Sequence, residues 1–243
     1  MTDRMSVTAV TGGSRGIGAA LSERLASEGH HILIGYQSDR EAADAVADRV
    51  RSLGRNAVAA AVDVTDPESL DRFFEAGATL GALTGVVAAA GAVRAVGRLA
   101  ELDPGEIARD LEVNLLGAVL TCRAAISQLE RTRGCLVLLG SAASTLGSPG
   151  TYVHYAAAKA GTAALSVGLS KELAPLGIRV NCVEPGTVWT DFHLDPQRPA
   201  KVARSVPLGR AGEPKEIAGA IAWLLSEDAA YTTGATLRVA GGL

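Results

Sequence analysis

The chain has 243 residues, of which 48% are hydrophobic and 20% are charged, and its formal net charge is −3. Its length suits one α/β domain of roughly 200–250 residues, and its weakly acidic balance, without a basic block, argues against a nucleic-acid partner. No apolar stretch approaches the roughly 18 residues that a membrane-spanning helix needs. The first residues also lack the apolar run of a signal peptide, so we expect no membrane partner.

The cysteines and the other metal-binding residue types indicate no metal site. Cys122, Cys135 and Cys182 are an odd number and lack metal-like spacing. We expect three reduced thiols, which is typical of a cytoplasmic protein. Cys182 lies in an apolar run, where a place in the core is expected rather than a role as a nucleophile.

Short apolar runs alternate with longer helical patterns along the chain. Strands are predicted at 6–11, 31–36, 57–62, 85–89, 134–139, 177–183 and 235–239. Helices are predicted at 16–28, 40–53, 67–80, 104–131, 154–174 and 214–226. This alternation is typical of βαβ units around a parallel sheet. We therefore expect a single α/β domain over residues 1–243, with a doubly wound seven-stranded parallel sheet, helices on both faces and ligands at the carboxyl ends of the strands.

The first predicted strand runs directly into a glycine-rich turn, Thr11-Gly-Gly-Ser-Arg-Gly-Ile-Gly18. A strand, such a turn and a helix N-terminus form an anion site for a pyrophosphate. Gly12 permits the turn, Gly16 lets the backbone approach the phosphates, and Gly18 lets helix and strand pack closely. Because turn glycines occur in many folds, the pattern indicates a dinucleotide site only together with its position and the residues downstream.

A second group of polar residues suits proton transfer. Tyr155 and Lys159 are four residues apart, so a helix places them about one turn apart on the same face. A phenol has a reference pKa near ~10, and a neighbouring ammonium lowers that pKa by favouring the phenolate. Such a pair passes a proton to or from a carbonyl or alcohol oxygen, which Ser141 is able to hold by a hydrogen bond. This chemistry interconverts C=O and CH–OH and needs a hydride carrier.

These motifs together resemble the short-chain dehydrogenase/reductase family, essentially from end to end. The resemblance implies a Rossmann fold in which Asn114, Ser141, Tyr155 and Lys159 form a catalytic tetrad. It also implies that the helix kinks at Asn114 and that the Asn114 backbone holds a water linked to the lysine. The alternative is a core asparagine bonded within its helix. The motifs that carry the resemblance are the glycine-rich turn, Asp63-Val64, Asn114-Leu-Leu-Gly117, Ser141, Tyr155-Ala-Ala-Ala-Lys159, Asn181, Pro185-Gly186, Thr233-Gly234 and Gly241-Gly242.

The residues after the second predicted strand favour NADPH as the cofactor. An NAD site usually has an acid there for the ribose 2′-hydroxyl, whereas this chain reads Gly-Tyr-Gln-Ser over 35–38. Arg15 is able to pair with a 2′-phosphate in bidentate fashion, and Ser38 and Arg40 add donors. Alternatively, Arg15 is a solvated turn residue and both cofactors bind. A shift of two residues would also bring Asp39 near the ribose.

Further cofactor contacts follow from the family resemblance. Asp63 is expected to bind the adenine amine, although it is also placed to cap the turn before Pro67. The backbone near Val188 is expected to hold the nicotinamide carboxamide, and Thr190 the phosphates. The complete set of predicted NADP(H)-binding residues is Gly12, Ser14, Arg15, Gly16, Ile17, Gly18, Tyr36, Gln37, Ser38, Asp63, Val64, Ala89, Gly91, Asn114, Tyr155, Lys159, Pro185, Gly186, Val188 and Thr190.

Two features depart from the family pattern. Family members commonly carry Asn-Asn-Ala-Gly after the fourth strand, whereas this chain has Ala-Ala-Ala-Gly over 88–91. The change bears on cofactor affinity and local rigidity, because the lost amides would tie neighbouring strands or hold the cofactor. The interval from Ser141 to Tyr155 is one residue longer than is common among acyl-carrier-protein reductases, and some sugar- and ketone-active relatives share the longer form.

The segment 186–212 carries three prolines and is expected to be a substrate loop, with a poorly ordered connector as the alternative. His193 is expected either to contact the substrate or to face solvent, and His154 to be a packing or surface residue. The predicted substrate-binding residues are Val93, Ser141, Ala143, Tyr152, Trp189 and Phe192.

The resulting prediction is an NADPH-dependent ketoreductase for a 3-oxoacyl thioester of fatty-acid or polyketide assembly, free or bound to a carrier protein. Arg131 and Arg133 suit an acidic carrier protein, whereas Leu176 stands where another basic residue would help. The alternative is a dehydrogenase or reductase of a sugar, a steroid or another free ketone or alcohol. A nucleotide sensor without catalysis is disfavoured by the intact tetrad. The resemblance also implies pairing of the long Ala-rich helices in a homodimer or homotetramer.

Overall fold

The computed structural model describes residues 6–243. Within that range, seven strands form one parallel sheet in the order β3-β2-β1-β4-β5-β6-β7, which confirms the predicted doubly wound fold. The strands are β1 (Val7–Thr11), β2 (His31–Tyr36), β3 (Ala57–Ala61), β4 (Leu83–Ala88), β5 (Cys135–Leu139), β6 (Arg179–Pro185) and β7 (Thr236–Val239). Two predicted boundaries were wrong, because β4 begins at Leu83, which pairs with Val7, and β6 runs on to Pro185, which pairs with Val239.

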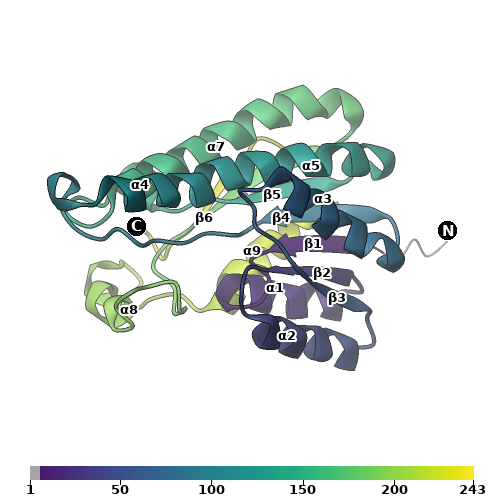
Figure 1. The fold of residues 1–243 in the computed structure, drawn as a ribbon, viewed down its shortest axis with the longest axis horizontal. Coiled ribbons are helices and arrows are strands. Elements are labelled where there is room, and N and C mark those ends of the chain that lie inside the picture. The colour runs from purple at the N-terminus through teal and green to yellow at the C-terminus, as the bar shows by residue number, and fades with distance from the viewer. Residues whose placement is uncertain (1–5) are drawn as a thin grey trace.

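Helices cover both faces of the sheet (Figure 1). One face carries α1 (Gly16–Ser27), α2 (Arg40–Ser52) and α9 (Pro214–Leu225), and the other carries α3 (Pro67–Ala76), α5 (Gly117–Thr132) and α7 (Val153–Leu173). Each face buries its own apolar cluster, with Leu21, Val46 and Ile221 in the first and Phe73, Leu129 and Leu173 in the second. Burial on both faces explains why the central strands are largely apolar in sequence.

Local signals in the sequence fix where several helices begin. Asp39, Asp66 and Asp103 are the N-caps of α2, α3 and α4 (Pro104–Leu111), and each carboxylate accepts a backbone N–H of the first turn. The predicted helix 67–80 is α3 followed by a short 3-10 turn over Gly77–Leu80. Two short helices, α6 (Ala143–Leu146) and α8 (Arg198–Val202), were not predicted, because one turn is too short to show a helical period.

The predicted helix 104–131 is broken at its centre. It consists of α4, a π-helical turn over Glu112–Leu116, and α5. Asn114 lies in that turn, and its side-chain amide donates to the backbone oxygens of Ala92 and Asp110. Because the amide takes up the Asp110 carbonyl, the helix widens there.

The strand order favours a ligand site at the carboxyl ends of the strands next to β1. β1 lies between β2 and β4. The chain adds β2 and β3 on one side of β1 and then returns to add β4 to β7 on the other side. Such a reversal opens a crevice at the carboxyl ends of the strands. No helix within residues 6–243 has both the length and the apolar character needed to cross a membrane.

The three cysteine thiols are buried and free. Burial raises the pKa of Cys122 to about 12 and the pKa values of Cys135 and Cys182 to about 11. Because the thiolate is the reactive form, we expect iodoacetamide to modify the folded protein far more slowly than the unfolded protein, in which all three react. Mass spectrometry after timed labelling measures this, and rapid modification of any of the three in the folded protein would contradict it.

Candidate active site

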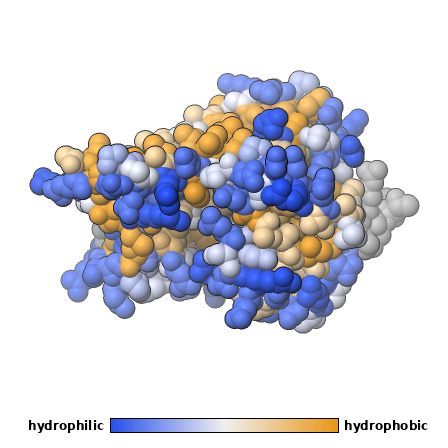
Figure 2. Space-filling view, viewed as in Figure 1, coloured by the Kyte–Doolittle hydropathy of each residue, from blue (hydrophilic) through white to orange (hydrophobic). Residues whose placement is uncertain are grey.

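A cavity of about 600 Å³ lies along the carboxyl ends of the central strands. Its walls come from the turn after β1, the segments after β4 and β5, the first turn of α7, and parts of the segment 185–205. Its outer part includes the exposed side chains of Leu146 and Leu194. Figure 2 shows apolar residues at the end of the molecule near α8. The cavity therefore extends from the crevice of the sheet to an apolar outer wall.

The glycine-rich turn has the shape that a dinucleotide requires. Gly12 and Gly16 have left-handed backbone conformations, with φ of 69° and 53°. A Cβ on Gly18 would overlap the carbonyl oxygen of Gly12, so the missing side chain lets α1 pack against the turn. The first turn of α1 has no side-chain cap and no acidic residue, and it lines the cavity. This N-terminus fits a pyrophosphate.

The adenosine end of the predicted site is partly assembled. Arg15, Tyr36 and Gln37 line the cavity, whereas Ser38 does not. Arg15 is exposed, and no carboxylate in residues 6–243 forms an ion pair with it. Asp39 accepts the Ala42 N–H at 3.0 Å as the cap of α2. Asp39, the alternative ligand for the ribose, is therefore the N-cap of α2.

Asp63 and Val64 also line this part of the cavity. One oxygen of Asp63 accepts both the backbone N–H and the hydroxyl of Thr65, at 2.9 and 2.7 Å. Asp63 therefore caps the turn that precedes Pro67, and Asp66 is the N-cap of α3. A contact between Asp63 and adenine stays a prediction.

Thr11 makes three hydrogen bonds to backbone groups at the end of β4 and just after it. The Thr11 hydroxyl accepts the N–H groups of Ala89 and Ala90 at 3.1 and 3.3 Å. It donates to the Val87 carbonyl at 3.4 Å. β1 is thereby tied to the segment after β4 without the usual asparagine side chains.

The structure brings three residues of the predicted tetrad to the cavity. Tyr155 and Lys159 lie one turn apart on α7, and Ser141 follows β5. The Lys159 ammonium is 5.7 Å from the centre of the Tyr155 ring and donates to the Leu139 carbonyl at 2.9 Å. Ser141 accepts the Ala143 N–H at 3.1 Å, which orients its hydroxyl.

Burial governs the protonation of this group. It raises the pKa of Tyr155 well above the ordinary phenol value, and a hydrogen bond with Ser141 acts in the opposite direction. Burial also lowers the pKa of Lys159 to about 8. At neutral pH Tyr155 therefore holds a proton that it is able to donate, and Lys159 is mostly charged. That Lys159 lowers the pKa of Tyr155 stays a prediction.

Asn114 lies behind the cavity wall rather than on it, and it is fully buried. Its Oδ1 is buried and has no hydrogen-bond partner among the described residues. A Cβ built on Gly91 would be 2.9 Å from that oxygen and 3.8 Å from the Lys159 ammonium, so all three groups are close. An unpaired buried oxygen at this place suits a donor from water or from a bound cofactor. The Asn114 backbone oxygen accepts the Thr162 hydroxyl at 3.3 Å.

Most predicted substrate residues lie around Tyr155. Val93, Ala143, Tyr152 and Phe192 line the cavity, and the rings of Tyr152 and Phe192 are centred 5.2 and 5.7 Å from that of Tyr155. Trp189 lies outside the cavity lining, and 41% of it is exposed. It follows the buried Val188 in an extended bridge to Gly212, where successive side chains point to opposite sides.

The segment 186–212 is ordered by its own contacts. The bridge between Val188 and Gly212 joins its two ends. Arg198, in α8, donates to the Tyr152 hydroxyl at 2.9 Å and lies 5.0 Å from the centre of that ring. No sequence pattern indicated this arginine, because it lies in an aperiodic stretch. His193 lines the cavity and bonds to the Val188 carbonyl at 3.1 Å, and burial lowers its pKa.

Comparisons with known proteins agree with this geometry. A family model described as Enoyl-(Acyl carrier protein) reductase matches residues 12–243. YgfF, an uncharacterized oxidoreductase of Escherichia coli, is 38% identical over 98% of this chain and 100% of its own length. The 3-oxoacyl-(acyl-carrier-protein) reductase FabG of E. coli is 37% identical over 98% of this chain and 96% of its own. The 3beta-hydroxysteroid dehydrogenase 1 of Eggerthella lenta is 35% identical over 96% of this chain and 92% of its own length.

Solved structures show the same similarity. A double mutant of a Serratia marcescens short-chain dehydrogenase/reductase superposes with a TM-score of 0.90 at 32% identity, covering 98% of this chain and 97% of that one. A blue fluorescent protein from a metagenomic library, in complex with NADPH, gives a TM-score of 0.90 at 33% identity over the same shares. The chain therefore belongs to the short-chain dehydrogenase/reductase family and is an oxidoreductase that acts on CH–OH and C=O groups.

Proposed function

We propose that the protein is an NADPH-dependent ketoreductase that reduces the carbonyl of a 3-oxoacyl thioester in fatty-acid or polyketide assembly. The observation that carries this proposal is the group formed by Ser141 and the buried Tyr155 and Lys159 in a cavity with an apolar outer wall. The 37% identity to a 3-oxoacyl-(acyl-carrier-protein) reductase over nearly the whole chain supports the thioester as substrate.

Residues of this chain carry the proton side of the reaction. NADPH, when bound, supplies a hydride to the carbonyl carbon. Ser141 and Tyr155 hydrogen-bond the carbonyl oxygen, and Tyr155 donates its proton to that oxygen as negative charge develops there. The charged Lys159 stabilises the same negative charge. Because Tyr155 is only 7% exposed, water competes little for these hydrogen bonds.

The cofactor preference rests on Arg15. We expect Arg15→Ala to raise the KM for NADPH roughly tenfold or more, because charge-assisted hydrogen bonds to the 2′-phosphate are lost. The KM for NADH, which lacks that phosphate, should stay nearly constant. Arg24→Ala is the matched control, because Arg24 is an exposed arginine that pairs with Glu28 and lies outside the cavity lining. Equal changes for both cofactors in Arg15→Ala would contradict the assignment.

A free ketone or alcohol, such as a steroid or sugar, is the second candidate substrate. The longer interval between Ser141 and Tyr155 favours it, and so does the 35% identity to a 3beta-hydroxysteroid dehydrogenase. The test compares NADPH oxidation with a 3-oxoacyl thioester and with a cyclic ketone or a steroid ketone. A kcat/KM for the thioester well above that for the free ketones supports the proposal, and the reverse order selects the second candidate.

The quaternary structure is part of the same proposal. We infer a homodimer or homotetramer, because the π-helical turn, α5 and α7 leave the apolar side chains of Leu116, Val119 and Val167 exposed. Sedimentation equilibrium of the purified protein tests this, and a monomer at micromolar concentration would refute it.

A further inference from the structure

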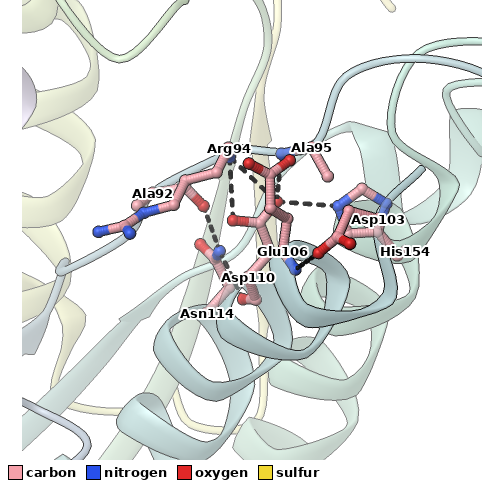
Figure 3. Close-up of polar contacts among 8 residues, drawn as sticks. All are labelled: Ala92, Arg94, Ala95, Asp103, Glu106, Asp110, Asn114 and His154. Atoms are coloured by element: carbon pink, nitrogen blue, oxygen red, sulfur yellow. Dashed lines mark hydrogen bonds and ion pairs between the residues drawn. The ribbon is translucent and has the colours of Figure 1, made fainter.

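Asp110 is a buried carboxylate in α4, and both of its oxygens are fully engaged. Only 1% of the residue is exposed. One oxygen accepts the Arg94 N–H at 2.9 Å, and the other accepts the Ala95 N–H at 3.1 Å and bonds to His154 Nε2 at 2.9 Å. Figure 3 shows the carboxylate between the segment after β4 and the histidine. Asp110 thus fixes the backbone of residues 94–95, next to the substrate-side Val93.

His154 completes this contact from α7. It is buried, 6% exposed, and immediately precedes Tyr155. The carboxylate accepts two backbone N–H groups, and because a carboxylate acts as an acceptor, we assign the donor of the third contact to His154 Nε2. Its Nδ1 is buried and has no hydrogen-bond partner among residues 6–243, so Nε2 makes the ring's polar contact. The prediction of a packing or surface histidine therefore missed a specific buried hydrogen bond.

The helix end that carries Tyr155 has no cap of its own. α7 begins at Val153, and its N-cap residue, Tyr152, makes no side-chain capping bond. An uncapped first turn is free to fray unless other elements hold it. Here the holding contacts are His154 to Asp110, the Tyr152 hydroxyl to Arg198, and the Thr151 carbonyl, which accepts the Gly97 N–H at 2.7 Å. Tyr155 is the third residue of that turn.

The same aspartate also reaches Asn114. The Asp110 carbonyl accepts the Asn114 amide at 2.8 Å, and that amide also donates to the Ala92 carbonyl. Through its backbone and its carboxylate, one residue therefore joins the segment 92–95, the π-helical turn and the first turn of α7.

We propose that Asp110 and His154 are positioning residues whose hydrogen bond sets Tyr155 at its working place relative to the substrate wall at Val93. The inference rests on the proposed function, because it concerns proton donation by Tyr155 to a carbonyl oxygen. A misplacement of about 1 Å in a catalytic group is able to cost about a hundredfold in rate. A loosened first turn of α7 should therefore lower kcat much more than it changes cofactor binding at the distant Gly12–Gly18 turn.

The test compares three substitutions in the full-length protein. His154→Leu removes the donor, whereas His154→Gln keeps an N–H donor of similar reach. His31→Leu is the matched control: His31 is a buried histidine, 3% exposed, that accepts the Asn56 N–H at 2.8 Å at the opposite end of the strands. For each variant, kcat, KM, the NADPH dissociation constant and hydrogen exchange of segments 92–97 and 152–156 are measured below the unfolding temperature.

The expected result is a kcat lowered about 30- to 100-fold in His154→Leu, with NADPH affinity unchanged and faster exchange in both segments. His154→Gln should restore most of the kcat and the slow exchange. His31→Leu should lose stability but keep its kcat. If His154→Leu does not fold, His154→Met serves in its place, because it also lacks a donor and its flexible side chain fills the space.

Two results would overturn the proposal. One is wild-type kcat and wild-type exchange in a folded variant without a donor at position 154. The other is a loss of kcat that His154→Gln does not relieve, which would assign the residue a packing role. If the wild-type protein reduces no carbonyl compound, the proposed function fails instead, and the exchange rates still decide whether the pair holds the two segments together.

Discussion

Tyr155→Phe is expected to lower kcat for carbonyl reduction by about a thousandfold, within the range that a general acid contributes. The substitution removes only the phenol oxygen. The ring keeps its contacts with Tyr152 and Phe192, whose centres lie 5.2 and 5.7 Å away, so the fold and the cavity should persist. NADPH affinity, measured by fluorescence titration, should change little, because Tyr155 is only one of the predicted cofactor-binding residues and the Gly12–Gly18 turn and Lys159 are untouched.

The matched control for this prediction is Tyr231→Phe, since Tyr231 is fully exposed and lies outside the cavity lining. Its kcat should equal that of the wild type. A Tyr155→Phe protein that keeps a kcat within about tenfold of wild type would show that another group donates the proton. Loss of turnover together with loss of NADPH binding would instead indicate a damaged site.

Gly18→Ala is expected to produce the largest loss of cofactor affinity. The added Cβ would overlap the Gly12 carbonyl oxygen and lie 2.9 Å from the Gly13 Cα, and these are backbone atoms that have little room to move. α1 must then separate from the turn, which moves its N-terminal N–H groups away from the pyrophosphate. We expect the NADPH dissociation constant to rise about a hundredfold, as for the loss of more than one charge-assisted hydrogen bond.

Gly219→Ala is the matched control, because a Cβ at that position in α9 meets no atom within 4 Å. It should leave NADPH affinity unchanged and raise the free energy of unfolding by about 0.5–1 kcal/mol. If Gly18→Ala does not fold, Gly16→Ala tests the same turn through its φ of 53° and a Cβ 3.0 Å from the Thr190 side chain. Wild-type affinity in both turn variants would refute the assignment of the turn to the pyrophosphate.

The sequence predicted the central strands well because they are buried on both faces. The runs that became β1, β2 and β5 are almost continuously apolar, so each was found close to its observed bounds. The family resemblance implied a kink at Asn114, but the helical pattern did not indicate the π-helical turn. That turn depends on where the Asn114 amide finds acceptors, and Ala92 lies 22 residues away in the chain. A helical period alone does not reveal such a tertiary contact.

The residues of the site also differ in whether the sequence alone predicts their roles. Residues that act through backbone shape or through a fixed spacing, such as Gly18 and the pair Tyr155 and Lys159, carry their signal in the sequence. Asp110 carries almost none, because a single acid on a helix reads as solvent-exposed until its partners at 94, 95 and 154 are known. Trp189 was predicted to line the substrate pocket because its neighbours in the chain do. In the extended backbone at the Val188–Gly212 bridge successive side chains point to opposite sides, so Val188 lines the cavity and Trp189 does not.

Transfer of deuterium from the cofactor tests the central claim most directly. NADPH deuterated at C4, in each stereochemical form, is incubated with the wild-type protein, a 3-oxoacyl thioester and a set of free ketones, and the products are analysed by mass spectrometry. The proposed reaction predicts one deuterium at the carbinol carbon of the thioester product from one of the two forms, and almost none with Tyr155→Phe. Tight NADPH binding without deuterium transfer to any carbonyl compound would contradict it.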